Sequence, residues 1–290
     1  MKMSSLSLLF LIGFGAMASA WAGQSAHSGP PEVAESSGLS DLALARETSD
    51  PTSNLWYLFT EFSLSTTPAE SFRKSNAFTL ELQPSMPVSL TRSWRLLNYP
   101  ELVLGSQGTR SGSQATGVKS FSWLGALSPV SNRMGFSWGL GPYVSFPVST
   151  DEDLAPSQWQ FGGGGVAAYR GENFIASAIV KSGWATSNGD KQAGSLQIQY
   201  NLQHFFSNGT QIGLGHPTIE YNWNRDGSGG WDVPIGVDVA KIFHLGAVPV
   251  KIMLEYDFTV INDSRWNPQH LIRITILPVL PCPLKGPIFE

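Results

Sequence analysis

Apolar and polar residues alternate along most of the chain after residue 54. The clearest run is 248–260, where every second residue from Val248 to Val260 is apolar and the positions between them include Lys251, Glu255 and Asp257. A period of two is typical of a β-strand that has one apolar and one polar face. The same alternation recurs in four further runs, at residues 78–83, 196–203, 231–239 and 272–276.

Turn sequences separate these runs and predict about twelve strands. The strands are expected to begin near residues 55, 76, 93, 114, 134, 159, 173, 193, 209, 230, 247 and 269. Short turns such as 207–209 and 244–247 follow even-numbered strands, and longer polar loops such as 149–158 follow odd-numbered ones. An even strand number with alternating short and long connections is typical of bacterial outer-membrane barrels. Each strand with its connection takes about 19 residues, enough for a spanning strand of about 9–11 residues.

Two strands depart from this regular pattern. The apolar face switches sides at Pro217, which predicts a kink or a bulge because proline cannot donate a ladder hydrogen bond. Residues 96–104 alternate poorly, so the pattern does not predict which of their side chains face inward.

Alternation alone fits either a soluble β-sandwich or a barrel in lipid. Strand number, loop asymmetry and an export signal favour the barrel. The predicted fold is therefore all-β: a transmembrane antiparallel β-barrel of about 12 strands with a disordered N-terminal leader. Tryptophans near the predicted strand ends suit the aromatic girdle of such a barrel, although a sandwich core would also use them. They are Trp94, Trp123, Trp138, Trp159, Trp184, Trp223, Trp231 and Trp266.

The first residues predict export across the inner membrane. Lys2 precedes an apolar stretch at 6–14, and small residues at 18–22 offer cleavage sites after Ala20 or Ala22. This is typical of a signal peptide over residues 1–22, with an N-terminal anchor helix as the alternative. Residues 23–53 are polar and rich in small residues, and predict either a flexible periplasmic leader or a plug. Residues 54–290 are assigned to the barrel.

Composition narrows the function classes. Only 14% of the 290 residues are charged and the net charge is −4, without a basic block, so no nucleic-acid partner is expected. The lone cysteine, Cys282, cannot form an internal disulfide. The expected partners are instead outer-membrane lipid and a small-molecule substrate.

The polar faces of the predicted strands supply candidates for the lumen lining. They are Glu81, Glu220, Asp232, Asp238, Lys251, Glu255, Asp257 and Arg273. Charges inside a membrane are expected to be paired or hydrated. Asp257 and Arg273 lie on adjacent antiparallel strands and could pair, and Lys251 and Glu255 share one face of one strand. Such charges either line a selective pathway or form a salt-bridge network that fills a narrow barrel.

No motif predicts catalysis. The glycine run 162–165 lacks the Lys-Ser/Thr ending of a phosphate-binding loop, and no Gly-x-Ser-x-Gly elbow occurs. His216, the strongest candidate base, has no nearby His or Cys in the sequence to complete a metal site. We therefore expect no catalytic residue, no metal, no cofactor and no enzymatic activity. A barrel hydrolase acting on lipid or peptide, and a closed structural barrel, remain the alternatives.

Three segments carry a family resemblance. They are 82–90 with Trp94, 136–147, and 231–237 with 241–246. Over residues 76–279 the chain resembles the MetA-pathway phenol-degradation family of outer-membrane β-barrels. The resemblance implies an outer-membrane location, assembly by the barrel-insertion machinery, and a channel or transporter function for a small molecule, with a hydrophobic or aromatic cargo as one possibility. It supplies no catalytic residues.

Overall fold

A computed structural model describes residues 38–66, 76–109, 113–131, 134–155, 157–185, 194–223, 230–262, 268–282, 284 and 286–289. The expected signal peptide and the first part of the expected leader lie outside these residues.

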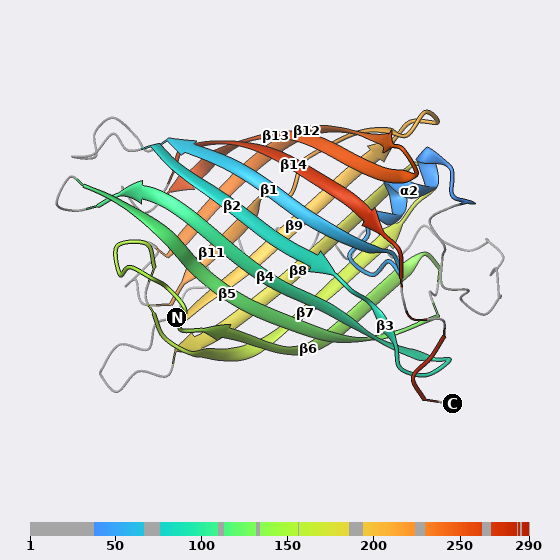
Figure 1. Ribbon diagram of the computed structural model, residues 1–290, viewed down its shortest axis with the longest axis horizontal. Coiled ribbons are helices and arrows are strands. Elements are labelled where there is room, and N and C mark those ends of the chain that lie inside the picture. Colours follow the sequence, from blue (N-terminus) through green and yellow to red (C-terminus); the bar gives the residue numbers. More distant parts are fainter. Residues whose placement is uncertain are drawn as a thin grey trace, which may run out of the picture. The chain divides into compact units, whose positions relative to one another are not determined.

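Within the described residues the chain forms one short helix and fourteen strand segments (Figure 1). The helix is α2 (Asp41–Glu47), and none of the described helical structure is long and apolar enough to cross a membrane. The strands are β1 (Trp56–Thr66), β2 (Asn76–Ser85), β3 (Val88–Ser89), β4 (Trp94–Gly108), β5 (Gln114–Pro129), β6 (Phe136–Phe146), β7 (Gln160–Arg170), β8 (Phe174–Ala185), β9 (Gly194–Phe205), β10 (Thr210–Gly213), β11 (Thr218–Asn222), β12 (Trp231–Leu245), β13 (Val248–Asn262) and β14 (His270–Leu280).

These segments make a closed barrel of 12 antiparallel strands. The segments β2 and β3 both pair with β4, and β10 and β11 both lie between β9 and β12, so each of these two pairs forms one interrupted strand. The last strand pairs with the first over nine residue positions, from Trp56 opposite Leu280 to Thr66 opposite His270. The predicted fold class is confirmed, and each predicted start lies within about two residues of an observed one.

The two faces of the barrel wall differ in chemistry. On β13 Ile252, Leu254 and Tyr256 are 41%, 52% and 42% exposed, whereas Lys251, Met253 and Glu255, which alternate with them, are 2%, 1% and 1% exposed. Because the sheet closes on itself, the buried face lines the lumen and the exposed apolar face meets lipid.

The two irregular strands have local causes. The strand containing Pro217 breaks between Gly213 and Thr218, and Gly215 in that break has φ +73°. The predicted kink is thus confirmed. On β4 the register against β5 shifts between Val103 and Leu104, which explains the poor alternation there.

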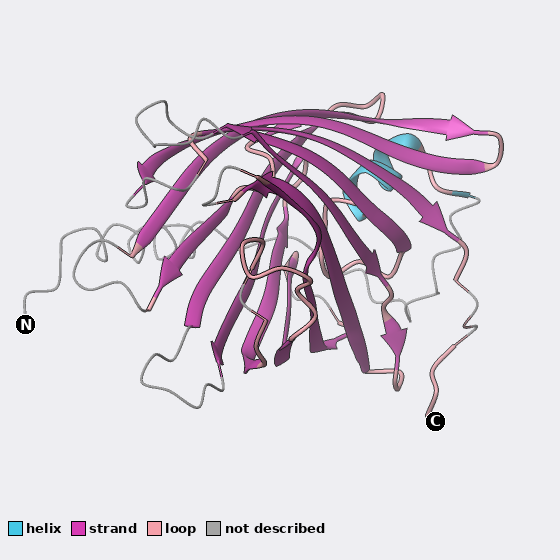
Figure 2. Cartoon of the chain, turned by 60° about the vertical axis from the view of Figure 1, so that its left-hand side comes forward, coloured by secondary structure: helices cyan, strands magenta, loops and turns pink. Residues whose placement is uncertain are grey.

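Short connections gather at one end of the barrel, which we call the tight-turn end. There β7 ends at Arg170 and β8 begins at Phe174, and only residues 246 and 247 separate β12 from β13. Helix α2 contacts β9, β10 and β12 at this end. Figure 2 shows the helix against the inner side of the strands.

Candidate functional site: the barrel lumen

Arg273 on β14 is the centre of a buried charge cluster. Its Nη2 lies 2.7 Å from Asp257 Oδ2, its Nη1 3.3 Å from Glu255 Oε1, and its Nε 3.5 Å from Glu61 Oε1. All four residues are at most 9% exposed. Three carboxylates from β1 and β13 thus surround one guanidinium, which provides the pairing that a charge at membrane depth needs.

The break in the strand at Gly215 joins this cluster. The backbone N–H of His216 donates to Glu255 Oε1 at 2.9 Å, and its Nδ1 lies 3.6 Å from Glu255 Oε2. The His216 carbonyl accepts a bond from Arg273 Nη1 at 3.1 Å. The His216 ring stands edge-on to Phe59, with ring centroids 6.2 Å apart. The N–H and the carbonyl of this irregular backbone therefore both form hydrogen bonds with charged side chains, which compensates for the loss of bonds to water.

A second charge pair crosses the lumen. Lys181 Nζ on β8 contacts Glu101 Oε2 on β4, and three strands separate β4 from β8 around the wall. Gln83 Nε2 donates to the same Glu101 oxygen at 3.3 Å. Because the partners are not on neighbouring strands, their side chains must meet inside the barrel.

A third polar group lies where β9 approaches β12. Asp238 Oδ1 accepts bonds from Gln203 Nε2 and from the backbone N–H of Gly215, each at 2.7 Å. Asp238 and Gln203 are 5% and 0% exposed. Together with Glu81 and Lys251, these three groups form a charged belt, which we define as Glu61, Glu81, Glu101, Lys181, Asp238, Lys251, Glu255, Asp257 and Arg273.

The eight candidates from the sequence fall in different parts of the lumen wall. Six of them are buried: Asp232, Asp238, Lys251, Glu255, Asp257 and Arg273. Glu81 and Glu220 are half-buried, and Glu220 lies opposite Asp232 in the register of β11 and β12. The structure brings Glu255, Asp257 and Arg273 together, and the expected Asp257–Arg273 pair is present. Lys251 donates instead to Ser49 Oγ, at 2.8 Å.

Sequence reasoning missed Glu61, Glu101 and Lys181. On β1 the inward positions before Glu61 are Tyr57 and Phe59, so an aromatic lumen side hides the alternation. The signal that was available is the single acidic residue in an otherwise uncharged strand, which is costly at membrane depth unless it faces the lumen.

Part of the inner wall is apolar, on strands that also carry Glu101 and Lys181. Leu97, Tyr99, Leu124, Ala126 and Val166 form one buried cluster, and Tyr143 and Ile179 pack against it. These residues come from β4, β5, β6, β7 and β8. The inner wall therefore carries an apolar patch on the same strands as the Glu101–Lys181 pair, nearer the tight-turn end.

Residues 38–55, the pre-barrel segment, enter the lumen at the tight-turn end. Together with Tyr57, Phe59, Lys251 and other wall residues, the segment lines a cavity of about 50 Å³. A site of that size holds only a few water molecules. This cavity beside the segment is therefore too small for a larger solute.

Glu47 at the end of α2 ion-pairs with Arg170, with 2.6 Å between Oε1 and Nη1. Burial raises the pKa of the Glu47 carboxyl, but hydrogen bonds from Arg170 and Ser53 and the Arg170 charge outweigh it, so the pKa lies below its ordinary value. The folded segment therefore favours the ionised form of the Glu47 carboxyl.

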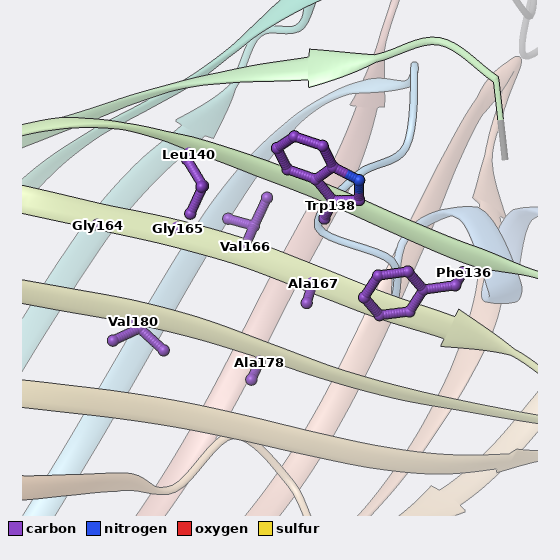
Figure 3. A pocket seen from close by; sticks show the side chains of 9 residues that line it. All are labelled: Phe136, Trp138, Leu140, Gly164, Gly165, Val166, Ala167, Ala178 and Val180. Atoms are coloured by element: carbon purple, nitrogen blue, oxygen red, sulfur yellow. The ribbon is translucent and has the colours of Figure 1, made fainter. Parts of the chain in front are cut away.

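A larger hollow of about 620 Å³ lies on the outer wall across β6, β7 and β8. Figure 3 shows Phe136 and Trp138 standing beside small residues such as Gly165 and Ala167. All nine residues that line it are apolar or glycine. It belongs to the lipid-facing surface and not to the lumen.

Among the described residues no group of three or more His, Cys, Asp or Glu side chains could hold a metal ion.

No protein-family model matches the chain, and no curated protein matches its sequence. Solved structures share its fold. The COG4313 outer-membrane channel from Pseudomonas putida F1 superposes with a TM-score of 0.58 at 14% identity, covering 78% of this chain and 95% of that one. The NanC porin gives 0.47 at 8% identity, covering 78% and 98%. The KdgM porin gives 0.42 at 11% identity, covering 76% and 97%.

The fold and the lipid-facing surface together define a class of protein: a transmembrane β-barrel of the bacterial outer-membrane type. The comparisons do not extend to the MetA-pathway family itself.

Proposed function

We propose that the protein is a passive outer-membrane channel for a small hydrophobic or aromatic molecule, which diffuses through the barrel lumen. The observation that carries this proposal is an apolar patch beside a charged belt on the inner wall of the lumen. A uniformly apolar interior would suit a filled barrel, whereas a polar belt at membrane depth suits a hydrated pathway.

The charged belt supports a preference for cations over anions. Within it six carboxylates, including Glu81 and Glu101, face three basic groups, which are Lys181, Lys251 and Arg273. An excess of one sign in a low-dielectric passage concentrates ions of the other sign. We therefore expect cationic and neutral solutes to pass more readily than anions.

The apolar wall supports an aromatic part in the cargo. Tyr99 and Tyr143 contribute rings to this wall beside Leu97 and Leu124. Aromatic rings attract other rings in offset or edge-on arrangements. A planar apolar molecule could therefore move along this side while its polar group faces the belt.

We also propose that the protein is not an enzyme. His216, the candidate base of the hydrolase alternative, is held by Glu255 and packs against Phe59. Within the described residues no serine hydroxyl bonds its ring, as the nucleophile of a Ser-His pair would.

Assembly in the membrane would require the barrel-insertion machinery, because the sheet edges must pair before they meet hydrocarbon.

Planar-bilayer recording of the full purified chain tests the channel. Discrete current steps with a reversal potential that favours cations are the expected result. Glu101→Gln should reduce the cation preference, whereas Glu152→Gln, on an exposed loop, serves as the matched control. Absence of current steps in the full chain and in the Arg170→Gln variant described below would overturn the channel.

The cargo class is tested by current block. Benzyltrimethylammonium and tetramethylammonium carry the same charge and differ by an aromatic ring. Longer block by the aromatic cation would support the apolar wall as part of the path, and equal block would remove the support for an aromatic cargo.

A further inference from the structure

The pre-barrel segment is anchored to the wall by an apolar contact. Ser40 caps α2 by accepting a bond from the Ala43 N–H at 3.3 Å. The helix then buries Leu44 and Ala45 completely, in one cluster with Ile175 and Ile242 of the barrel wall. A helix of seven residues is not stable alone in water, so these contacts hold it.

Ser49 joins the segment to three strands on one side of the lumen. Its Oγ donates to Gln211 Oε1 at 2.8 Å and accepts from Lys251 Nζ at 2.8 Å. Its carbonyl accepts from Asn201 Nδ2 at 3.3 Å. These partners lie on β10, β13 and β9.

The next residues bind strands on the other side. Thr52 Oγ1 and Ser137 Oγ on β6 lie 2.6 Å apart. The hydroxyl of Tyr99 on β4 donates to the Pro51 carbonyl. Ser49 and Thr52 are three residues apart, yet they contact strands that are not neighbours in the sheet. The segment therefore crosses the lumen and does not follow its wall.

Arg170 at the end of β7 holds the crossing segment by charge. It ion-pairs with Glu47 and also contacts Asp50, whose side chain is fully buried. A buried carboxylate without its partner costs several kcal/mol, so the pairing and the buried position depend on each other.

We propose that residues 40–54 are a plug that closes the tight-turn end of the lumen, and that its crossing part, residues 48–54, is released when the channel opens. This rests on the proposed channel function and adds its regulation. The contacts that cross the lumen are hydrogen bonds and ion pairs, and these exchange readily for bonds to water when the segment leaves. The apolar anchor of α2 lies at the rim, so the crossing residues can leave while the helix stays bound.

A reversible disulfide tests the plug. Thr52→Cys and Ser137→Cys, made together with Cys282→Ser, place two thiols where two hydroxyls now lie 2.6 Å apart. A disulfide needs about 3.5–4.5 Å between Cβ atoms, which that separation of hydroxyls suits. We expect channel openings to fall at least about tenfold on oxidation and to return on reduction.

The control tether lies within the wall. Ser106 and Thr116 face each other on β4 and β5, with hydroxyls 2.8 Å apart. Oxidising Ser106→Cys with Thr116→Cys should leave the openings unchanged. Equal openings in the oxidised and reduced plug tether would overturn the plug while leaving the channel intact. Failure of the plug disulfide to form under oxidant in the folded barrel would overturn the crossing geometry.

A loosening variant gives the opposite test. Arg170→Gln removes both ion pairs, so openings should rise at least about tenfold and hydrogen exchange of residues 41–53 should speed up. Faster exchange with unchanged openings would overturn the plug. Current steps in neither this variant nor the full chain would instead mean that the channel proposal itself fails.

Discussion

Asp257 on β13 forms an ion pair with Arg273 on β14, with Asp257 Oδ2 2.7 Å from Arg273 Nη2, although Glu255 is the residue opposite Arg273 in the register. Glu255 and Glu61 lie on the other sides of the same guanidinium. One cation therefore compensates three buried carboxylates, and the cluster depends on Arg273 more than on any one of its acidic partners.

Arg273→Gln should destabilise the barrel by about 3–5 kcal/mol, because it leaves buried carboxylates without their cation. Guanidinium unfolding in lipid vesicles measures this. Arg92→Gln, at an exposed turn position, should change stability by less than about 0.5 kcal/mol. An equal loss of unfolding free energy in the two variants would mean that the charge cluster does not stabilise the barrel.

Gly215→Ala should disturb the break that holds His216 against Glu255. Gly215 has φ +73°, and an added Cβ would lie 2.3 Å from the Glu255 carboxyl carbon. Gly246 also has a positive φ, 63°, but an added Cβ there would meet nothing within 4 Å. Gly246→Ala should therefore cost only about 1 kcal/mol of backbone strain, and Gly215→Ala clearly more. Similar unfolding midpoints for the two variants would contradict this account.

The glycine run on β7 should divide into sensitive and tolerant positions. A Cβ on Gly162 would lie 1.8 Å from the Ser182 carbonyl oxygen, whereas one on Gly163 would meet only the Gly141 carbonyl, at 3.8 Å. We expect Gly162→Ala to reduce the yield of folded barrel and Gly163→Ala to leave it unchanged. Heat-modifiable migration on gels measures the folded fraction, and a tolerant Gly162→Ala would show that β7 and β8 adapt.

Acid should loosen the pre-barrel segment. The folded-state pKa of Glu47 lies below its ordinary value of 4.5, so its contribution to stability is present above that value. The contribution is lost as the pH falls through the lowered pKa. The protection of residues 41–53 against hydrogen exchange, measured relative to the intrinsic exchange rate at each pH, should therefore fall as the pH drops below 4.5.

Glu47→Gln is the control for the acid response. This variant keeps the shape of the side chain but cannot titrate, so the protection of residues 41–53, relative to the intrinsic exchange rate, should lose most of its dependence on acid pH. An unchanged acid response in Glu47→Gln would assign the response to another group.

The barrel was predictable because its two faces meet different solvents. On β13 the exposed Leu254 and the buried Glu255 are neighbours in sequence. Residues that face lipid therefore alternate with residues that face the lumen, and the sequence shows this as a period of two. The prediction lost detail where the inner face is itself apolar, as at Phe59 on β1 and Ile179 on β8. Alternation then disappears although the strand remains.

Contacts between distant strands were not predictable. The Glu101–Lys181 contact depends on how the closed barrel brings β4 opposite β8, and neither residue has a local signal for the other. Helix α2 is similar, since its seven residues lie in a polar stretch and are buried by strands more than a hundred residues away. Such contacts are set by closure and not by periodicity.

The pairing of β14 with β1 has a consequence for the order of assembly. The first strand cannot be sealed until the last has been made, so the seam joins residues about 220 positions apart in the chain and closes late. Residues 40–54 precede the first strand, and they bond to β4, β6, β9, β10 and β13, none of which belongs to that seam. A sheet that is still open can therefore wrap around this segment. The segment would then act as a template for barrel closure as well as a plug in the closed barrel.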